Sequence, residues 1–176
     1  MTAEAHGPAD LDARGLVTEL FAALNDHDVE RIVGMHASDA VWEDPSLAAP
    51  ITGRAAIAEH LRVIHRAFPD LRFDGDVELY TGEQGRAGAR WRFGATMTGP
   101  LDPPGFAPTG KRTTVAGVCL YTFEDGLIAR HRQYYDMWGM LEQLGLMPAL
   151  ESVPARLVVG LQRAGARVSK SLHRAS

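Results

Sequence analysis

The hydrophobic pattern of this chain changes its period near Pro69, and this change limits the folds that the chain can adopt. Before Pro69, apolar residues recur at the spacing of amphipathic helices. From Leu71 to Tyr135 they alternate with polar residues instead, as in strands with one buried face. Helices followed by a run of strands predict an α+β fold, in which helices cover one face of a curved antiparallel sheet.

Capping and turn-forming residues set the expected bounds of these elements. Asp28 is a candidate N-cap, Pro69 ends the third helix, and the EDG turn at 124–126 joins two strands into a hairpin. Residues 98–111, rich in proline and glycine, are a long loop of the kind that either borders a functional site or is disordered. A curved sheet covered by helices encloses a cavity whose open end is a natural ligand site. We expect helices at 11–24, 29–33, 52–68 and 138–144, and strands at 40–43, 71–80, 88–98, 113–123 and 127–135.

The composition, with 45% hydrophobic and 23% charged residues, fits one globular domain. We expect a domain at 10–150, a flexible N-terminus at 1–9 and a basic extension at 151–176. No apolar run reaches the roughly 20 residues of a membrane helix, and the acidic first segment does not resemble a signal peptide. Cys119, the single cysteine, excludes an internal disulfide and fits a reducing compartment, so we expect a cytoplasmic protein.

Charge is distributed unevenly along the chain. Five basic residues and no acid follow Glu151, so the net charge of −4 leaves −9 for the preceding part. An acidic body is unsuited to nucleic-acid binding, which needs a basic face. The extension allows two interpretations: a helix that contacts a partner subunit or an acidic surface, such as a carrier protein or anionic lipid, or a solvated tail.

Six segments, taken in order, carry a resemblance to a known family. They are VWEDP (41–45), ITGRAAIAEHL (51–61), FPDLRF (68–73), TGPLDPPGFAPTGKR (98–112), FEDGLI (123–128) and YYDMWGMLEQLGLMP (134–148). Over roughly residues 11–148 the set resembles the SnoaL-like polyketide cyclases, which belong to the cone-shaped superfamily named after nuclear transport factor 2. This resemblance implies a homodimeric α+β cone that holds one small organic molecule and needs no metal or cofactor.

The resemblance also implies a reaction. Named members of the family close a polyketide ring by intramolecular aldol chemistry, with an aspartate before the last helix as general acid/base, and Asp136 occupies that position. Relatives on the same fold open epoxides with an Asp–Arg–Asp set, so the fold alone does not choose the reaction. The chain departs from the family in three places. Glu43 replaces a frequent histidine, strand 113–123 has no histidine, and Arg130 and Arg132 replace an acid and an aromatic residue.

Asp136 is the first candidate catalytic residue, because Tyr134 and Trp138 flank it. If the last strand has no bulge, the even-numbered residues of 128–136 share one face, and Ile128 directs that face inward. A carboxylate among rings loses solvation, which suits it to proton exchange, whereas a nearby Arg132 favours the ionised form. The alternative role for Asp136 is to cap the last helix.

Asp44 is the second candidate carboxylate. It follows a strand and precedes a proline, a place where aspartate often forms only a turn. Trp42 lies on the same strand face and offers a flat wall to an aromatic or polyene substrate. A second carboxylate across the pocket from Asp136 would divide the acid and base roles, and Arg132 would orient an enolate or epoxide oxygen. The alternative role for Arg132 is a salt bridge with Asp136 that serves stability alone.

The remaining candidates are expected to bind substrate, and each has a simpler alternative. Trp91 and Phe93 fit the core equally well, and His65 borders an apolar helix stripe. His131 falls on the opposite strand face. His60 and His65 lack the spacing of a zinc site, so we expect no metal. The predicted substrate-binding residues are Trp42, His65, Trp91, Phe93, Tyr134 and Trp138.

Residues and resemblance together predict a cofactor-free cyclase of secondary metabolism that acts on a small hydrophobic, oxygenated, polyketide-like substrate. Two alternatives stay open. One is an epoxide hydrolase or epoxide-opening cyclase that uses Asp136, Asp44 and an arginine. The other is a non-catalytic module that binds a small molecule in the cone.

Overall fold

The computed structural model describes residues 12–75, 77–82 and 85–148, and the predicted α+β fold is confirmed there. The predictions for 1–9 and 151–176 concern residues outside this part of the chain. The helices are α1 (Ala13–Asn25), α2 (Val29–Gly34), α3 (Arg54–Ala67) and α4 (Met137–Gln143). The strands are β1 (His36–Glu43), β2 (Ile51–Thr52), β3 (Arg72–Phe73), β4 (Glu78–Gly82), β5 (Arg86–Thr96), β6 (Arg112–Glu124) and β7 (Leu127–Tyr135).

Local signals in the sequence explain the helix ends. The Asp28 side chain accepts a hydrogen bond from the Arg31 backbone N–H, and Asp12 accepts one from Gly15 in the same way. Both are N-caps that satisfy an otherwise unpaired backbone donor. Helix α3 ends at Ala67, shortly before Pro69, which disfavours helical conformation in the residue that precedes it.

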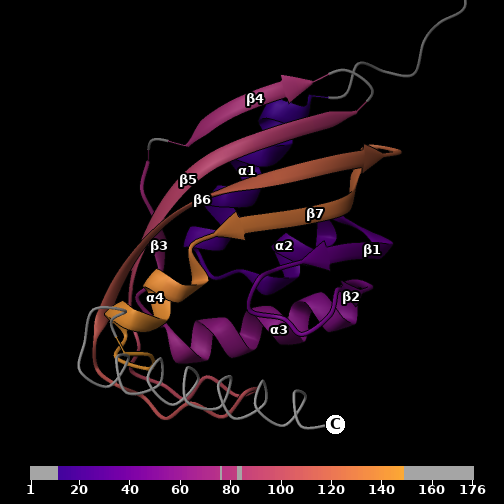
Figure 1. Ribbon diagram of the computed structural model, residues 1–176. Helices are drawn as coiled ribbons and strands as arrows, with labels where there is room; N and C mark the ends of the chain where they lie inside the picture. The colour runs from indigo at the N-terminus through magenta and orange to yellow at the C-terminus, as the bar shows by residue number, and fades with distance from the viewer. Residues whose placement is uncertain (1–11, 76, 83–84, 149–176) are drawn as a thin grey trace, which may run out of the picture.

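The sheet has the order β2-β1-β7-β6-β5-β3, and β4 also pairs with β5. Figure 1 shows the long strands β5 and β6 curving over the helices. The sheet is mixed rather than purely antiparallel, because β1 runs parallel to β7. The predicted strand at 71–80 is divided into β3 and β4, which pair with different parts of β5.

A bulge in β7 changes which side chains face inward. Phe123 pairs with Ile128 but Thr122 pairs with Arg130, so Ala129 has no partner on β6. An extra residue shifts the alternation by one and moves every later side chain to the other face. His131 is therefore buried, while Tyr134 is exposed.

The core lies between the concave face of the sheet and helices α1 to α3. The loop at 98–111 contains a single bridge, between Leu101 and Phe106, and the buried Leu101 side chain packs at the end of the core. No helix among the described residues is long and apolar enough to cross a membrane.

Candidate active site

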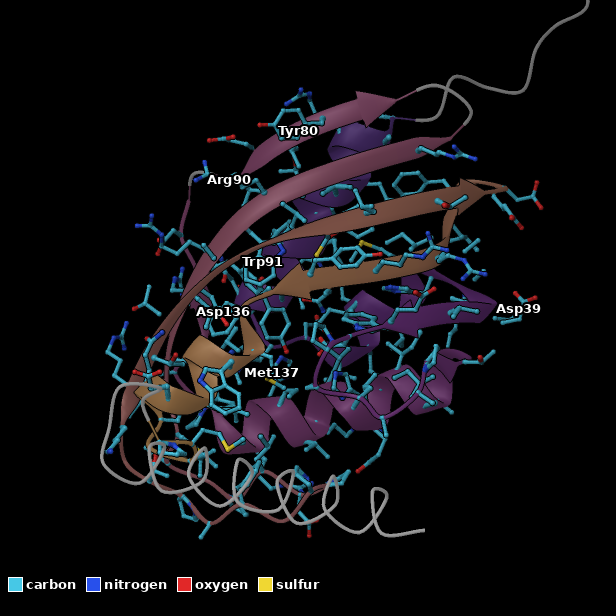
Figure 2. The ribbon with its side chains drawn as sticks, in the orientation of Figure 1. Asp39, Tyr80, Arg90, Trp91, Asp136 and Met137 are labelled. Carbon is cyan, nitrogen blue, oxygen red and sulfur yellow. The ribbon has the colours of Figure 1, made fainter. Side chains whose placement is uncertain are left out.

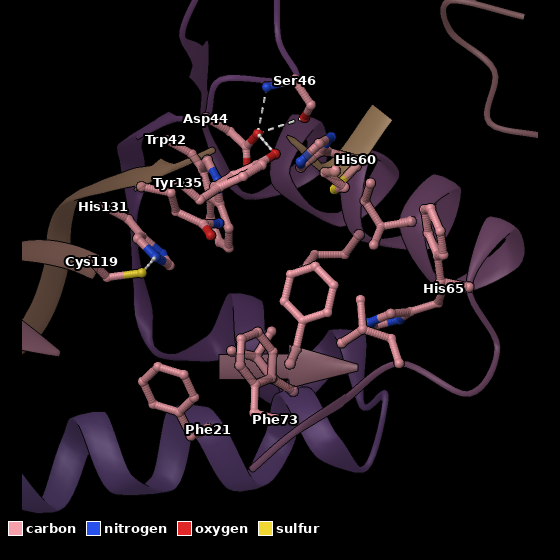
Figure 3. A pocket seen from close by; sticks show the side chains of 18 of the residues that line it. Phe21, Trp42, Asp44, Ser46, His60, His65, Phe73, Cys119, His131 and Tyr135 are labelled. Atoms are coloured by element: carbon pink, nitrogen blue, oxygen red, sulfur yellow. Dashed lines mark hydrogen bonds between the residues drawn. The ribbon is translucent and has the colours of Figure 1, made fainter. Parts of the chain in front are cut away.

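A cavity of about 90 Å³ lies between the sheet and helices α1 and α3 (Figure 3). Its wall is mainly apolar: Phe21 and Leu24 come from α1, Phe73 from β3 and Met140 from α4. A mainly apolar wall that also carries convergent polar groups is the usual lining of a small-molecule site. The polar and weakly polar lining residues, apart from Trp42, are Asp44, Ser46, His60, His65, Cys119, Tyr121, His131, Gln133 and Tyr135.

Asp44 is the acidic residue among those that line the cavity. Its Oδ1 accepts hydrogen bonds from the Ser46 backbone N–H at 2.7 Å, the Ser46 hydroxyl at 2.6 Å and the Tyr135 hydroxyl at 2.9 Å. The Ser46 backbone bond closes the turn that an aspartate before proline favours. Asp44 therefore both closes a turn and lines the cavity. Its carboxylate is fixed by hydrogen-bond donors from the β1–β2 connection and from β7.

Tyr135 and His60 flank this carboxylate. Burial raises the pKa of Tyr135 far above its ordinary value, and the negative charge of Asp44 adds to the increase. The phenol therefore stays protonated and donates to Asp44. Burial lowers the pKa of His60, and the charge of Asp44 opposes this effect only in part, so the imidazole favours its neutral form.

His65 follows His60 on α3 and forms the opposite side of the cavity (Figure 3). Its ring stacks on His27, with centroids 4.1 Å apart and planes 4° apart. Burial, aided by His27, lowers the pKa of His65 to about 4. No three His, Cys, Asp or Glu side chains within the described ranges gather closely enough to hold a metal ion.

Asp136 does not face the cavity, and the prediction that it would is wrong. Its side chain is exposed and accepts a hydrogen bond from the Gly139 backbone N–H at 2.8 Å, which makes it the N-cap of α4. Figure 2 shows it at the junction of β7 and α4. The reason is the bulge at Ala129, because the expected inward face required a regular strand.

Three more predicted residues lie outside the cavity wall, and for Arg132 and Tyr134 of β7 the same bulge is the reason. Arg132 pairs with Glu43, with Nε 3.0 Å from Oε1, rather than with Asp136. Tyr134 is 50% exposed and Trp138 on α4 is 40% exposed, so neither lines the cavity.

Trp91 is buried but does not line the cavity either. It packs in the core against Phe73 and Phe93, and its Nε1–H donates to Cys119 Sγ at 3.0 Å. Of the predicted substrate-binding residues, the structure places Trp42, His65 and Phe93 in the wall, together with the candidate base Asp44.

Several residues of the site were missed by the sequence analysis. His60 could have been found, because it follows Ile57 by three positions and so shares the stripe that Leu61 and Ile64 define. The inward positions of His131, Gln133 and Tyr135 had no such signal, since they depend on a bulge in the pairing of two strands. Ser46 becomes part of the site only through the turn at Asp44.

Comparison with known proteins gives one curated relative and several solved structures. The chain is 33% identical to the epoxide hydrolase LasB of Streptomyces lasalocidi over 138 residues, which are 77% of this chain and 44% of that protein. The chain thus spans less than half the length of this relative.

The solved structures show the same fold. TsrD from Streptomyces laurentii has a TM-score of 0.67 at 23% identity, over 80% of this chain and all of that chain. AclR from Streptomyces galilaeus has a TM-score of 0.64 at 25% identity, over 89% of this chain and 95% of that chain. A hypothetical protein with a ketosteroid isomerase-like fold from Catenulispora acidiphila has a TM-score of 0.62 at 18% identity, over 74% of this chain and 92% of that chain.

A family model supplies the more specific match. It covers residues 15–144, which include α1 from its third residue, α2, α3, the whole sheet and α4, together with every residue that lines the cavity. By this match the chain belongs to the SnoaL-like polyketide cyclase family.

Proposed function

We propose that the protein is a cofactor-free enzyme that closes a ring in a small hydrophobic, oxygenated, polyketide-like substrate through an enol or enolate, with Asp44 as the base. The observation that carries this proposal is the position of Asp44. Among the described residues it is the carboxylate in the cavity wall, and three hydrogen bonds fix its Oδ1. A base held in one orientation loses little freedom as the transition state forms.

The position of Tyr135 favours enolisation. Its hydroxyl donates its one proton to Asp44 Oδ1 at 2.9 Å, and once Asp44 has taken a proton from the substrate this hydroxyl is free to donate to a substrate oxygen on the same side. Enolisation removes a proton from one carbon and stabilises charge on the oxygen of its neighbour, so it needs the two groups side by side. The apolar wall excludes water from the reactive intermediate.

Epoxide opening is the second candidate, because the curated relative is an epoxide hydrolase. An in-line displacement needs a base for the nucleophile and an acid for the epoxide oxygen on opposite sides of the reacting carbon. Asp44 and Tyr135 are neighbours instead, and the predicted Asp–Arg–Asp set is not assembled, because Asp136 and Arg132 lie outside the cavity wall. This candidate therefore ranks second.

The test compares two substitutions of one kind, Asp44→Asn and Asp136→Asn. Acetonylacetone is a small dione with exchangeable hydrogens beside its carbonyls, and NMR in deuterated buffer measures their exchange. We expect Asp44→Asn to slow the catalysed exchange by at least about a hundredfold, the usual scale for loss of a general base. Asparagine caps helices as well as aspartate does, so Asp136→Asn should keep both the fold and the exchange rate. Loss of exchange in Asp136→Asn alone would reverse the assignment.

A further inference from the structure

Four buried polar atoms gather beside the cavity. Within the described chain, Trp42 Nε1, His131 Nδ1, Tyr121 Oη and His36 Nε2 have no hydrogen-bond partner, and each side chain is at most 2% exposed. The ring centroids of Trp42 and His131 are 3.8 Å apart, those of Tyr121 and His131 are 4.7 Å apart, and those of His36 and Trp42 are 5.5 Å apart. Nearly all buried polar atoms in proteins are hydrogen-bonded, so a group of such atoms in one place requires an explanation.

Neighbouring contacts determine which of these atoms are donors. His36 Nδ1 lies 2.8 Å from the Ile32 carbonyl oxygen, which can only accept, so Nδ1 carries the proton and Nε2 is an acceptor. Cys119 Sγ accepts from Trp91 and lies 3.4 Å from His131 Nε2. Burial raises the pKa of Cys119 to about 12, so the thiol keeps its proton, and its contact with His131 joins two groups that can each donate or accept.

Burial lowers the pKa of His131 well below its ordinary value, so the ring is neutral, and its Nδ1 is a donor or an acceptor according to the tautomer. The indole N–H of Trp42 is a donor by nature, and the Tyr121 hydroxyl keeps its proton because burial raises its pKa. Two unpaired donors therefore belong to side chains that line the cavity, Trp42 and Tyr121, and the unpaired Nδ1 of His131 belongs to a third.

We infer that Trp42 and Tyr121 form a subsite for an uncharged oxygen acceptor, such as a ketone carbonyl. Two donors match the two lone pairs of one carbonyl oxygen and stabilise the charge that develops on it. No arginine or lysine of the described chain lines the cavity, and Asp44 is in the same wall, as Figure 3 shows. An anionic ligand would thus be desolvated beside a carboxylate without a counter-charge, which is unfavourable.

The subsite supplies the second half of the ring closure and in that role rests on the proposed function. Asp44 takes a proton from the carbon beside one carbonyl group, and the resulting enolate carbon bonds to the carbon of a second carbonyl group held in the subsite. The π electrons of the second carbonyl move to its oxygen, and the proton that Asp44 took ends on that oxygen. The reaction is an isomerisation and needs no co-reactant.

Ligand binding tests the subsite without turnover. Acetophenone and ethylbenzene have the same shape, but only acetophenone carries an oxygen, and benzoate is its anionic counterpart. We expect the wild type to bind acetophenone more tightly than ethylbenzene and to reject benzoate, as measured by NMR titration. Tyr121→Phe should weaken acetophenone binding by about tenfold, the upper range for one hydrogen bond, and leave ethylbenzene binding unchanged. Trp42→Phe should act in the same direction.

Tyr134→Phe is the matched control, because Tyr134 lies on the exposed face of the same sheet and should change neither affinity. Tyr121→Phe keeps the ring and removes a hydroxyl that has no partner, so its melting temperature should not fall. Unchanged acetophenone affinity in both Tyr121→Phe and Trp42→Phe would overturn the subsite, as would benzoate binding as tight as that of acetophenone. A failure of the proposed function looks different: Asp44→Asn would retain exchange while these affinities still respond to Tyr121→Phe.

Discussion

Burial keeps the histidines around the cavity neutral, and this makes the stability of the protein depend on pH. Between pH 6.5 and about 4, an unfolded chain protonates His65 while the folded protein does not. The unfolded state then binds more protons, so the free energy of unfolding falls as the pH falls through this window. Burial also lowers the pKa of His36, His60 and His131, and they act in the same direction.

His65→Gln tests this linkage at a single residue. Glutamine does not titrate, so the variant should lose less stability than the wild type between pH 6.5 and about 4. Urea unfolding at a series of pH values measures the difference. Above pH 7 the two curves should differ by a constant amount, because His65 is neutral in both states there. Parallel curves over the whole range would show that His65 titrates normally in the folded protein.

The elements show which features of the protein could be predicted from its sequence. Helix ends, the hairpin turn and the alternating strands depend on residues that are close in the chain, and the structure has them within a few positions of the prediction. The bulge at Ala129 depends on how β7 pairs with β6, and no local signal marks it. One unpaired residue removed Asp136 from the cavity and brought in Tyr135, which binds the other candidate, Asp44.

Two side-chain amides join helices to strands, and Asn25 at the end of α1 offers a test at this scale. Its Nδ2 donates to the Phe73 carbonyl oxygen at 3.2 Å, and its Oδ1 accepts from the Phe73 backbone N–H at 2.7 Å. Gln143 of α4 bonds to the Thr114 backbone in the same manner. Asn25→Ala leaves both backbone groups of Phe73 without these partners, so we expect a loss of about 1–3 kcal/mol in the free energy of unfolding.

Asn25→Asp is the matched control, because it keeps the acceptor for the Phe73 N–H and loses only the donor. It should cost less than Asn25→Ala in urea unfolding. Phe73 also lines the cavity, so Asn25→Ala should weaken ethylbenzene binding as well. Equal stability of Asn25→Ala and the wild type would show that β5 alone holds β3 in place.

The convex face of the sheet carries an apolar patch that concerns the whole molecule. Its four members and their exposed fractions are Tyr80 (59%), Val118 (40%), Leu120 (47%) and Tyr134 (50%). Val118 pairs with Tyr134, and Leu120 and Tyr80 both pair with Gly88, so the four lie on one surface. Two arginines lie among these residues, Arg90 opposite Val118 and Arg132 opposite Leu120, and they pair with Glu78 and Glu43; Figure 2 labels Tyr80 and Arg90.

Exposed aromatic and aliphatic side chains next to arginine are typical of protein interfaces, and a contiguous apolar patch is uncommon on monomers. We expect a second copy of the chain to cover it, with two-fold symmetry, because such a surface can pair with itself.

Light scattering after size-exclusion chromatography should then give twice the mass of the chain. Leu120→Glu places a charge in the centre of the patch and should yield monomers, whereas Thr114→Glu, on the same face of β6 but outside the patch, should leave the dimer intact. Since Leu120 points away from the cavity, the Leu120→Glu monomer should still bind acetophenone, and this separates loss of the interface from loss of the fold. A wild type that is monomeric at micromolar concentration would rule the interface out.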